Sequence, residues 1–431
     1  MSHLLCPECN QNYTKYSWCQ PCNSKHFQND FDKWTSGNNA IDKFIQDAQL
    51  NATSNLEPII EWIPHDNFQY LEKIAKGGFG TMHVIDRTDG QYIEWDVKNQ
   101  RWHRYEKHCL DYVALKKLDN TLVTLNENFL NEITIHLNVP GTMQLLHGFS
   151  QDPETNKYIM VLKFFYDGNF RDYLKKNFNN IELINWKRKL EYLKELAFIL
   201  ETIHKLDKMH YNFHPGNILS NNFQSDLLYI SDSGLSRFIG QNTKNPEKRQ
   251  IFGVFPYMAP EVLSGKEYTK AADIYSFGIV AYEIVTGFAP YYDIPHDRNL
   301  ALQICNGLRP KIPEHIPKLI TSLIMRCWDA RVIHRPTFGE LERELWKYYN
   351  NYMENDYKNS NEITNQIKQS EEFSKNKEKV RFWNLIRRKK STPPPVNYKK
   401  HPQAIYTSRL PKPKNEENFE KKLEELTSNN Y

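Results

Sequence analysis

Residues 210–217 read His-Tyr-Asn-Phe-His-Pro-Gly-Asn, and residues 230–235 read Ile-Ser-Asp-Ser-Gly-Leu. Asp232 in the second stretch follows Asn217 in the first by fifteen residues. A carboxylate and an amide oxygen are both ligands that the hard cation Mg²⁺ accepts. An Asp-Ser-Gly sequence alone is usually a turn. Its combination with Asn217 at this spacing favours a magnesium site.

A glycine cluster lies earlier in the chain, between two segments with the pattern of strands. Residues 76–80 read Lys-Gly-Gly-Phe-Gly. Glycines let backbone amides approach a triphosphate without a clash from Cβ atoms. A glycine-rich hairpin by itself is more often only a tight turn, so this motif gains weight only from its neighbours.

A lysine on a predicted strand follows the glycine cluster. Residues 112–116 read Tyr-Val-Ala-Leu-Lys, and Glu132 comes sixteen residues after Lys116, in a segment of helical pattern. A lone lysine on a strand is usually a solvated surface group. With Glu132 at this distance, the pattern predicts an ion pair that orients the Lys116 cation toward phosphate oxygens.

These motifs, in this order, resemble the eukaryotic protein kinases, and within them the tyrosine-kinase-like group. The resemblance covers residues 67–348. It implies a bilobal α+β fold, with a small β-rich lobe followed by a larger helical lobe. Further matching segments are Met-Ala-Pro-Glu at 258–261, Asp-Ile-Tyr-Ser-Phe-Gly at 273–278, Cys-Trp at 327–328 and Arg-Pro at 335–336.

The resemblance implies ATP and Mg²⁺ as cofactors. Leu162 takes the gatekeeper position, and Phe164 belongs to the hinge. The implied nucleotide contacts are Ile74, Gly77, Gly78, Gly80, Met82, Ala114, Lys116, Leu162, Phe164 and Leu219. The implied catalytic set is Lys116, Glu132, Asp232 and position 212, with Asn217 and Asp232 as magnesium ligands and Glu261 with Arg335 as a structural ion pair.

The chain departs from the family pattern at the residue that should accept a proton. The family's loop reads His-Arg-Asp-x-x-x-x-Asn, whereas Tyr211 replaces the arginine and Asn212 the aspartate here. An amide has nearly the shape of a carboxylate but no charge and no useful basicity. His214, Val254 and Ser233 (for the usual Phe) also depart from common family residues.

The departures cluster around phosphoryl transfer and leave the implied nucleotide site intact. They predict an ATP- and magnesium-binding pseudokinase or weak kinase. Such a protein would act in signalling as a scaffold or an allosteric partner of active kinases or other signalling proteins. One alternative is an active kinase on Ser, Thr or Tyr. A second is a nucleotide-free interaction module with a zinc-binding arm.

Four of the seven cysteines form two Cys-x-x-Cys pairs, at Cys6, Cys9, Cys19 and Cys22. This spacing is typical of a four-cysteine zinc site and of a reducing compartment rather than of disulfides. We expect a zinc-ribbon-like arm over residues 1–27, with a structural or partner-binding role. Unliganded thiols or a redox pair are the alternatives. No strongly basic cluster surrounds the cysteines, so nucleic-acid binding is not favoured.

The remaining segments frame the kinase-like region. Residues 28–66 are predicted to be a helical linker, and residues 86–111 an enlarged connection between strands. Residues 349–431 are predicted to be a mostly disordered tail with helices near 371–388 and 415–426. The tail is basic: residues 351–431 hold 17 Lys and Arg against 11 Asp and Glu, a net of +6 against +4 for the whole chain.

Membrane and export signals are not expected. No apolar run reaches the roughly 18–20 residues needed to span a bilayer, and the first residues lack the pattern of a secretory signal. The longest apolar run, at 274–289, contains Glu283 and is predicted to be a buried helix. We therefore expect a cytoplasmic protein, with a nuclear address left open by the basic residues 387–390.

Overall fold

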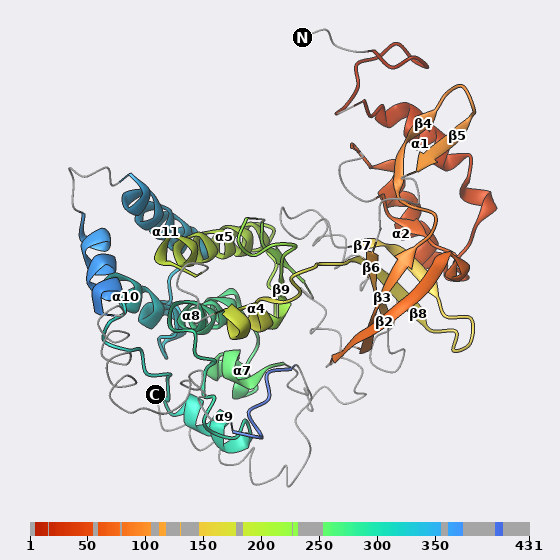
Figure 1. Cartoon of the computed structure of the whole chain (residues 1–431). Helices are drawn as coiled ribbons and strands as arrows, with labels where there is room; N and C mark the ends of the chain where they lie inside the picture. Colours follow the sequence, from red (N-terminus) through yellow and green to blue (C-terminus); the bar gives the residue numbers. More distant parts are fainter. Residues whose placement is uncertain are drawn as a thin grey trace, which may run out of the picture. The chain divides into compact units, whose positions relative to one another are not determined.

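The structure is a computed structural model of the chain, shown in Figure 1. It describes residues 5–15, 17–54, 59–77, 80–104, 112–117, 130, 146–177, 184–225, 227–231, 253–354, 361–373 and 401–407. The chain divides into two compact units, Met1–Phe165 (unit 1) and Tyr166–Tyr431 (unit 2). Unit 1 holds the main β-sheet and unit 2 is mainly helical, in the order that the kinase resemblance predicts.

The main sheet of unit 1 has the strand order β1-β7-β8-β6-β3-β2. All neighbours are antiparallel except β1 and β7, which are parallel. The strands are β1 (Glu61–Trp62), β2 (Phe68–Gly77), β3 (Gly80–Arg87), β6 (Tyr112–Lys117), β7 (Leu146–Gln151) and β8 (Tyr158–Lys163). Since four successive residues of β6 are buried, this strand is covered on both faces. The hydrophobic core comprises Ile63, Phe68, Ile85, Val113, Leu115, Ile159 and Val161.

The segment predicted as a helical linker is part of this sheet region. Its helix α2 (Asn39–Leu50) begins at Asn38, whose side chain accepts hydrogen bonds from the first helical amides, a common N-cap arrangement. The helix buries Phe44 edge-on against Phe149 of β7, with ring centroids 5.8 Å apart. After the helix, β1 pairs alongside β7. The strands approach so closely at Gly148 that a Cβ there would lie 1.9 Å from the carbonyl oxygen of Glu61.

Residues 86–111, predicted to be a connection, contain a second, two-stranded sheet made of β4 (Tyr92–Asp96) and β5 (Arg101–Arg104). A buried charge network joins this hairpin to the main sheet. The Glu61 carboxylate accepts from Arg87 at 2.6 Å and from Arg104 at 2.8 Å. The sequence signal for these strands was the alternating, aromatic-rich pattern within residues 86–111. The prediction of a connection did not use this pattern.

The hairpin also packs against the cysteine-bearing arm. Helix α1 (Gln20–Gln28) places the Phe27 ring on Trp102, with centroids 4.2 Å apart. Trp18 stacks on Trp102 at 6.0 Å, and its indole N–H donates to the Ala52 carbonyl at 2.8 Å. The arm and the hairpin therefore share one aromatic cluster inside unit 1.

Unit 2 is built around α8, which is buried from Ala272 to Thr286. This helix covers most of the apolar run 274–289, as predicted. Helix α11 lies along α5 (Figure 1) and starts with a capping box between Thr337 and Glu340. The helices are α4 (Phe170–Asn177), α5 (Trp186–Lys205), α7 (Pro260–Leu263), α8 (Lys270–Thr286), α9 (Arg298–Cys305), α10 (Lys318–Cys327) and α11 (Phe338–Met353), with a small sheet of β9 (Ile218–Leu219) and β10 (Tyr229–Ile230).

Short 3-10 turns complete the described elements: η1 (Phe31–Lys33), η2 (His65–Asn67), η3 (Pro215–Asn217), η4 (Phe255–Tyr257) and η5 (Val332–His334). Among the described residues, no helix combines the length and apolarity needed to cross a membrane.

Two described segments of the predicted tail are packed on unit 2. Residues 362–373 form a helix that buries Ile363 and Ile367. Residues 401–407 form a segment that begins with a turn, in which the Ala404 N–H donates to the His401 carbonyl at 2.9 Å, and that buries Ala404. The predicted helix at 371–388 overlaps the described helix at three residues only; its remainder and the predicted helix at 415–426 lie outside the described residues.

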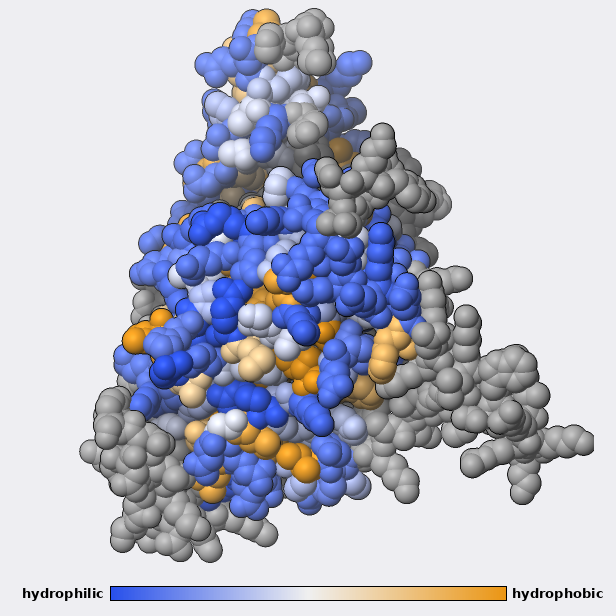
Figure 2. Space-filling model, turned by 90° about the vertical axis from the view of Figure 1, so that its left-hand side faces the viewer, coloured by the Kyte–Doolittle hydropathy of each residue, from blue (hydrophilic) through white to orange (hydrophobic). Residues whose placement is uncertain are grey.

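The outer face of unit 2 is largely hydrophilic. Figure 2, seen from the side of α10 and α11, shows small and separate hydrophobic areas on its coloured surface. Exposed large hydrophobic residues of this unit, such as Trp346 at 54% exposure and Met325 at 56%, are scattered rather than contiguous in sequence. Single exposed residues of this kind are normal on a protein surface.

Candidate functional site

The loop at residues 210–217 is held by the Asp273 carboxylate, which is fully buried in α8. Its Oδ2 accepts from the backbone N–H of His210 at 2.8 Å, and its Oδ1 from the N–H of Tyr211 at 3.2 Å. The same two oxygens accept from His204 Nε2 at 3.0 Å and from the Tyr268 hydroxyl at 2.5 Å. Burial opposes the charge of Asp273, but these donors prevail and lower its pKa.

Tyr211 has a left-handed backbone, with φ of 67°. Such a conformation in a residue with a Cβ costs on the order of 1–3 kcal/mol and persists only where surrounding contacts impose it. Here the bond to Asp273 supplies one contact, and the Tyr211 ring packs on Tyr268 with centroids 4.8 Å apart. An aromatic pair thus occupies the place where the family pattern has an arginine.

Asn212 is buried, with 6% of its surface exposed. Its backbone N–H donates to His210 Nδ1 at 3.2 Å, and its carbonyl accepts from Asn217 Nδ2 at 3.0 Å. The side-chain nitrogen of Asn217 therefore holds the loop together. This bond does not use the Asn217 Oδ1 atom, which is the atom that would bind a metal. The Asn212 side chain points toward Gly253, where an added Cβ would lie 3.5 Å from Oδ1.

The β9–β10 hairpin brings the loop next to the second motif quoted from the sequence. The Ser231 N–H donates to the Asn217 carbonyl at 2.8 Å, and the Ser231 carbonyl lies 3.2 Å from His210 Nε2. Ser231 directly precedes Asp232. Asp232 itself lies outside the described residues, as do Glu132 and Gly78.

His214 is buried and uncharged. Burial, with the nearby positive charge of Arg171, holds its pKa well below the usual value. Its Nδ1 accepts from the Gly216 N–H at 3.0 Å, as an unprotonated ring nitrogen must. His214 therefore supplies no positive charge at the position where family members carry a basic residue near the transferred phosphate.

Residues 253–258 form the wall beside this loop, and Val254 there is 2% exposed. The Tyr257 hydroxyl donates to the buried Glu283 carboxylate of α8. Burial raises the pKa of both groups. Sequence reasoning missed this pair because neither residue belongs to a motif that it used.

Glu261 and Arg335, predicted to pair, lie together in unit 2. Two parallel hydrogen bonds of 2.6 and 2.9 Å join the guanidinium to the carboxylate. Arg335 also donates to the carbonyls of Asp329 and Ala271. The pair therefore fixes α7, which follows the wall 253–258, to the segment before α11.

In unit 1, Lys116 lies on β6 and is 5% exposed. It is opposite Met82 of β3 and Met160 of β8. Ala114 is opposite Leu162, and Gly77 is opposite Gly80 at the β2–β3 turn. Phe164 follows β8 and is half-buried. Leu219 lies in unit 2 on β9, and the side chains of Ile74 and Met82 lie outside the described residues.

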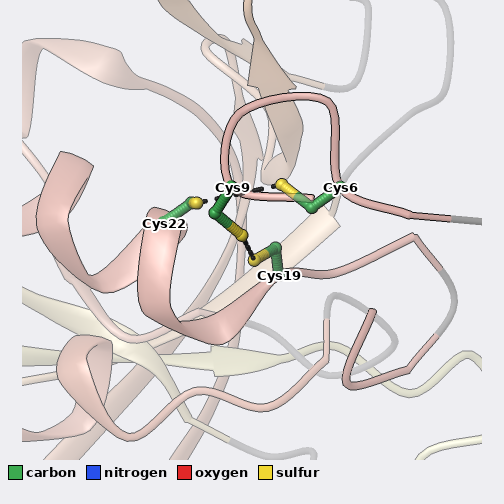
Figure 3. A group of neighbouring side chains, drawn as sticks. All are labelled: Cys6, Cys9, Cys19 and Cys22. Carbon is green, nitrogen blue, oxygen red and sulfur yellow. Dashed lines mark hydrogen bonds between the residues drawn. The ribbon is translucent and has the colours of Figure 1, made fainter. Parts of the chain in front are cut away.

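The four cysteines of the arm come together as predicted, with their sulfur atoms all within 4.8 Å of one another. Figure 3 shows Cys6 beside Cys22 and Cys9 beside Cys19, with sulfur separations of 3.8 and 3.5 Å. A tetrahedral Zn²⁺ with bonds of about 2.3 Å separates its sulfur ligands by about 3.8 Å. The donor set and its spacing therefore fit a zinc ion, and both distances are far too long for a disulfide.

Local structure explains how the cysteines converge. A turn brings the Asn10 N–H to the Cys6 carbonyl at 2.9 Å, and Cys19 is the N-cap residue of α1. Beside the cluster, the His26 ring stacks on Trp95 of the hairpin at 3.9 Å and lies 3.0 Å from Glu8. Burial raises the pKa of the Cys19 thiol. A bound metal would replace the thiol protons.

Comparisons with known proteins agree with this geometry. The family model described as protein tyrosine and serine/threonine kinase matches residues 69–345. The chain is 26% identical to a probable serine/threonine-protein kinase of Dictyostelium discoideum over 70% of this chain and 22% of that protein. It is 28% identical to a protein kinase and PP2C-like domain-containing protein of Arabidopsis thaliana, over 66% and 44% of the two chains.

Stress-activated protein kinase alpha of Dictyostelium discoideum is 32% identical over 41% of this chain and 29% of that protein. The chain thus spans less than half the length of each of these relatives. The matched region holds the main sheet apart from β1 and the helices of unit 2 as far as residue 345. The family implies ATP with Mg²⁺ as the nucleotide and metal. The chain belongs to the protein tyrosine and serine/threonine kinase family.

Proposed function

We propose that residues 67–348 bind ATP with Mg²⁺ but transfer phosphate slowly or not at all. The protein would then act in signalling, in the cytoplasm or the nucleus, as a scaffold or allosteric partner of active kinases or other signalling proteins. The observation that carries this proposal is Asn212, which stands in a firmly held loop at the place of the family's catalytic aspartate.

The magnitude of the loss follows from the chemistry of the side chain. The aspartate of active kinases accepts the hydrogen bond of the substrate hydroxyl and helps to remove its proton. A positioned base of this kind contributes ~10²–10⁴-fold. Kinase turnover is roughly 1–100 s⁻¹, so replacement by an amide leaves ~10⁻⁴ to 1 s⁻¹.

The surroundings of Asn212 support the same reading. Tyr211 offers no guanidinium to receive an activation-segment phosphate, and the buried His214 is uncharged. By contrast, Lys116 remains on its strand and Asn217 remains at the end of the loop. We assign Lys116 with Glu132 to the phosphates and Asn217 with Asp232 to the metal. The adenine contacts are assigned to Ile74, Met82, Ala114, Leu162, Phe164 and Leu219, with Gly77, Gly78 and Gly80 around the phosphates.

The tyrosine-kinase-like character is part of the proposal, as is a zinc ion at Cys6, Cys9, Cys19 and Cys22. The zinc-binding arm of residues 1–27 would have a structural or partner-binding role. The second candidate function is an active kinase, which the names of the relatives favour, since these are called serine/threonine or stress-activated kinases.

Two measurements on the purified chain separate these functions. Millimolar ATP with Mg²⁺ should raise the melting temperature by mass action, and Lys116→Ala should remove the shift. Radiolabelled transfer from ATP should be at or near background for the wild-type chain. Asn212→Asp should be at least as active, although Tyr211, His214 and Val254 still differ from active kinases. Rapid transfer by the wild-type chain that Lys116→Ala abolishes would establish the active kinase instead.

A further inference from the structure

Residues 401–407 pack on a surface of unit 2 that is formed by residues distant in sequence. The segment, drawn in blue in Figure 1, runs beside α7 and α9. Its contacts reach back 116 residues to Pro290 and 235 residues to Arg171. We call the surface that contacts it the tail groove, which consists of Arg171, Pro290, Tyr292 and His296.

The backbone of the segment is held along its length. The His401 N–H donates to the Tyr292 carbonyl at 2.9 Å, and the Gln403 carbonyl accepts from the His296 N–H at 3.0 Å. The Tyr406 carbonyl accepts from Arg171 Nη1 at 3.0 Å. Main-chain bonds of this kind recognise the backbone of a peptide largely irrespective of its side chains.

His296 connects the segment to the body of unit 2. It is 2% exposed, with Nδ1 2.8 Å from the Ile405 carbonyl and Nε2 3.0 Å from the Tyr291 carbonyl. The ring thus lies within hydrogen-bond distance of one carbonyl of the segment and one of the body of unit 2, between which it is packed.

One side chain of the segment supplies most of the specific contacts. The Tyr406 ring lies under the Arg171 guanidinium at 4.7 Å and meets the His296 ring edge-on at 4.7 Å. Its hydroxyl donates to the Pro290 carbonyl at 2.9 Å. Two residues earlier, Ala404 is 2% exposed. An aromatic anchor with a small buried residue beside it is the pattern of a peptide docked by a few dominant contacts.

The tail groove lies next to the loop that carries Asn212. Arg171 spans Tyr406 and Tyr257, because its guanidinium also lies 5.1 Å from the Tyr257 ring. Tyr257 in turn belongs to the wall 253–258, and its ring is 6.0 Å from that of His214. A protein segment brought to the loop from this side would meet the surface that residues 401–407 cover.

We propose that the tail groove is a peptide-recognition site and that residues 401–407 are its intramolecular ligand. While they are bound, they exclude a tyrosine-containing peptide of a protein partner. A tethered segment has an effective concentration near millimolar, so a partner binds well only after the segment leaves. This proposal does not depend on the rate of phosphoryl transfer, because it concerns peptide binding in the absence of nucleotide.

The test uses the full chain and a fluorescent peptide of residues 398–409. The peptide should bind the wild-type chain weakly, because the tethered segment competes with it. Tyr406→Ala removes the anchor from the tether but leaves the groove intact, so the peptide should bind this variant at least tenfold more tightly. Gln403→Ala is the matched control, since its side chain is exposed; it should behave as the wild type does.

Two further arms identify the binding surface. Adding Arg171→Ala to Tyr406→Ala should weaken peptide binding at least tenfold, with an unchanged melting temperature as evidence of folding. A peptide with alanine at position 406 should not bind Tyr406→Ala at all, and this arm needs no change in the groove. Equal affinity for the wild-type and Tyr406→Ala chains, or no binding to either, would overturn the proposal.

Discussion

Replacing Cys22 by serine is expected to abolish zinc binding and to unfold the N-terminal arm. The four sulfur atoms lie within 4.8 Å of one another at separations that suit Zn²⁺. A structural zinc ion contributes about 10–16 kcal/mol to the folding of small zinc-finger peptides. Helix α1 has only nine residues, too few to be stable alone. Without the metal, aromatic packing on Trp102 would be left to hold the arm, and we expect this packing to be insufficient to keep it folded.

The measurement is the zinc content of the purified chain, together with its tryptophan fluorescence. We expect one equivalent of zinc in the wild type and none in Cys22→Ser. Fluorescence should change as well, because Trp18 and Trp102 share the cluster that packs the arm. Cys305→Ser is the control: this half-buried thiol lies in unit 2 and should retain the full zinc content.

The pH dependence of zinc binding and the effect of a chelator also test the zinc site. Metal binding displaces thiol protons, so zinc should be released as the pH falls. The prediction would be contradicted if the wild-type chain contained no zinc and its fluorescence did not change on addition of a chelator. The four cysteines would then be unliganded thiols.

Most of the predicted motifs were readable because they depend on residues close together in sequence. The loop 210–217 is an example: its bonds from Asn212 to His210 and from Asn217 to Asn212 span five residues or fewer. The cysteine pairs are another, since their separation within the arm is short. The strand position of Lys116 followed from the apolar run before it. Such local patterns carry direct information about structure.

Other features depend on partners far along the chain. Strand β1 has only two residues, and its pairing with β7 rests on Gly148, whose missing Cβ permits the approach to Glu61. The position of the β4–β5 hairpin depends on Trp102, which packs on the arm. Residues 401–407 have no periodic pattern, and their docking depends on Arg171 and His296. Composition predicted a disordered tail because composition does not register contacts of this range.

The loop that carries Asn212 also shows what a sequence motif leaves out. The match at residues 273–278 marked this stretch as a family segment, but it did not predict that one carboxylate would accept four hydrogen bonds. Both backbone amides, from His210 and Tyr211, end on Asp273. The left-handed backbone of Tyr211 is therefore stabilised from another element, and its conformation is not encoded by the local sequence alone.

Asp273→Asn is accordingly expected to destabilise unit 2 by about 3–5 kcal/mol, the usual cost of breaking a buried charged network. The amide has one acceptor oxygen and one NH₂ group. Oδ2 faces the His210 N–H and Oδ1 faces the Tyr211 N–H, so either orientation of the amide sets a donor against a backbone donor. Chemical unfolding monitored by circular dichroism measures the loss.

Tyr268→Phe is the matched control, because it removes one donor to Asp273 and leaves both backbone bonds in place. Its expected cost is about 0.5–1.5 kcal/mol. Equal stability of Asp273→Asn and the wild type would show that the carboxylate does not hold the loop.

The pH dependence of stability gives a second test of the role of the Asp273 carboxylate. Because folding lowers the pKa of Asp273, its contribution is complete above the unfolded-state pKa of about 3.9. That contribution is lost as the pH falls through the lower, folded-state value. The stability difference between the wild type and Asp273→Asn should therefore not change through titration of this carboxyl between about pH 5 and 8, and it should shrink only in acid. A difference that disappeared near neutral pH would assign the stabilisation to another group, and the anchor of the Asn212 loop would have to be sought elsewhere.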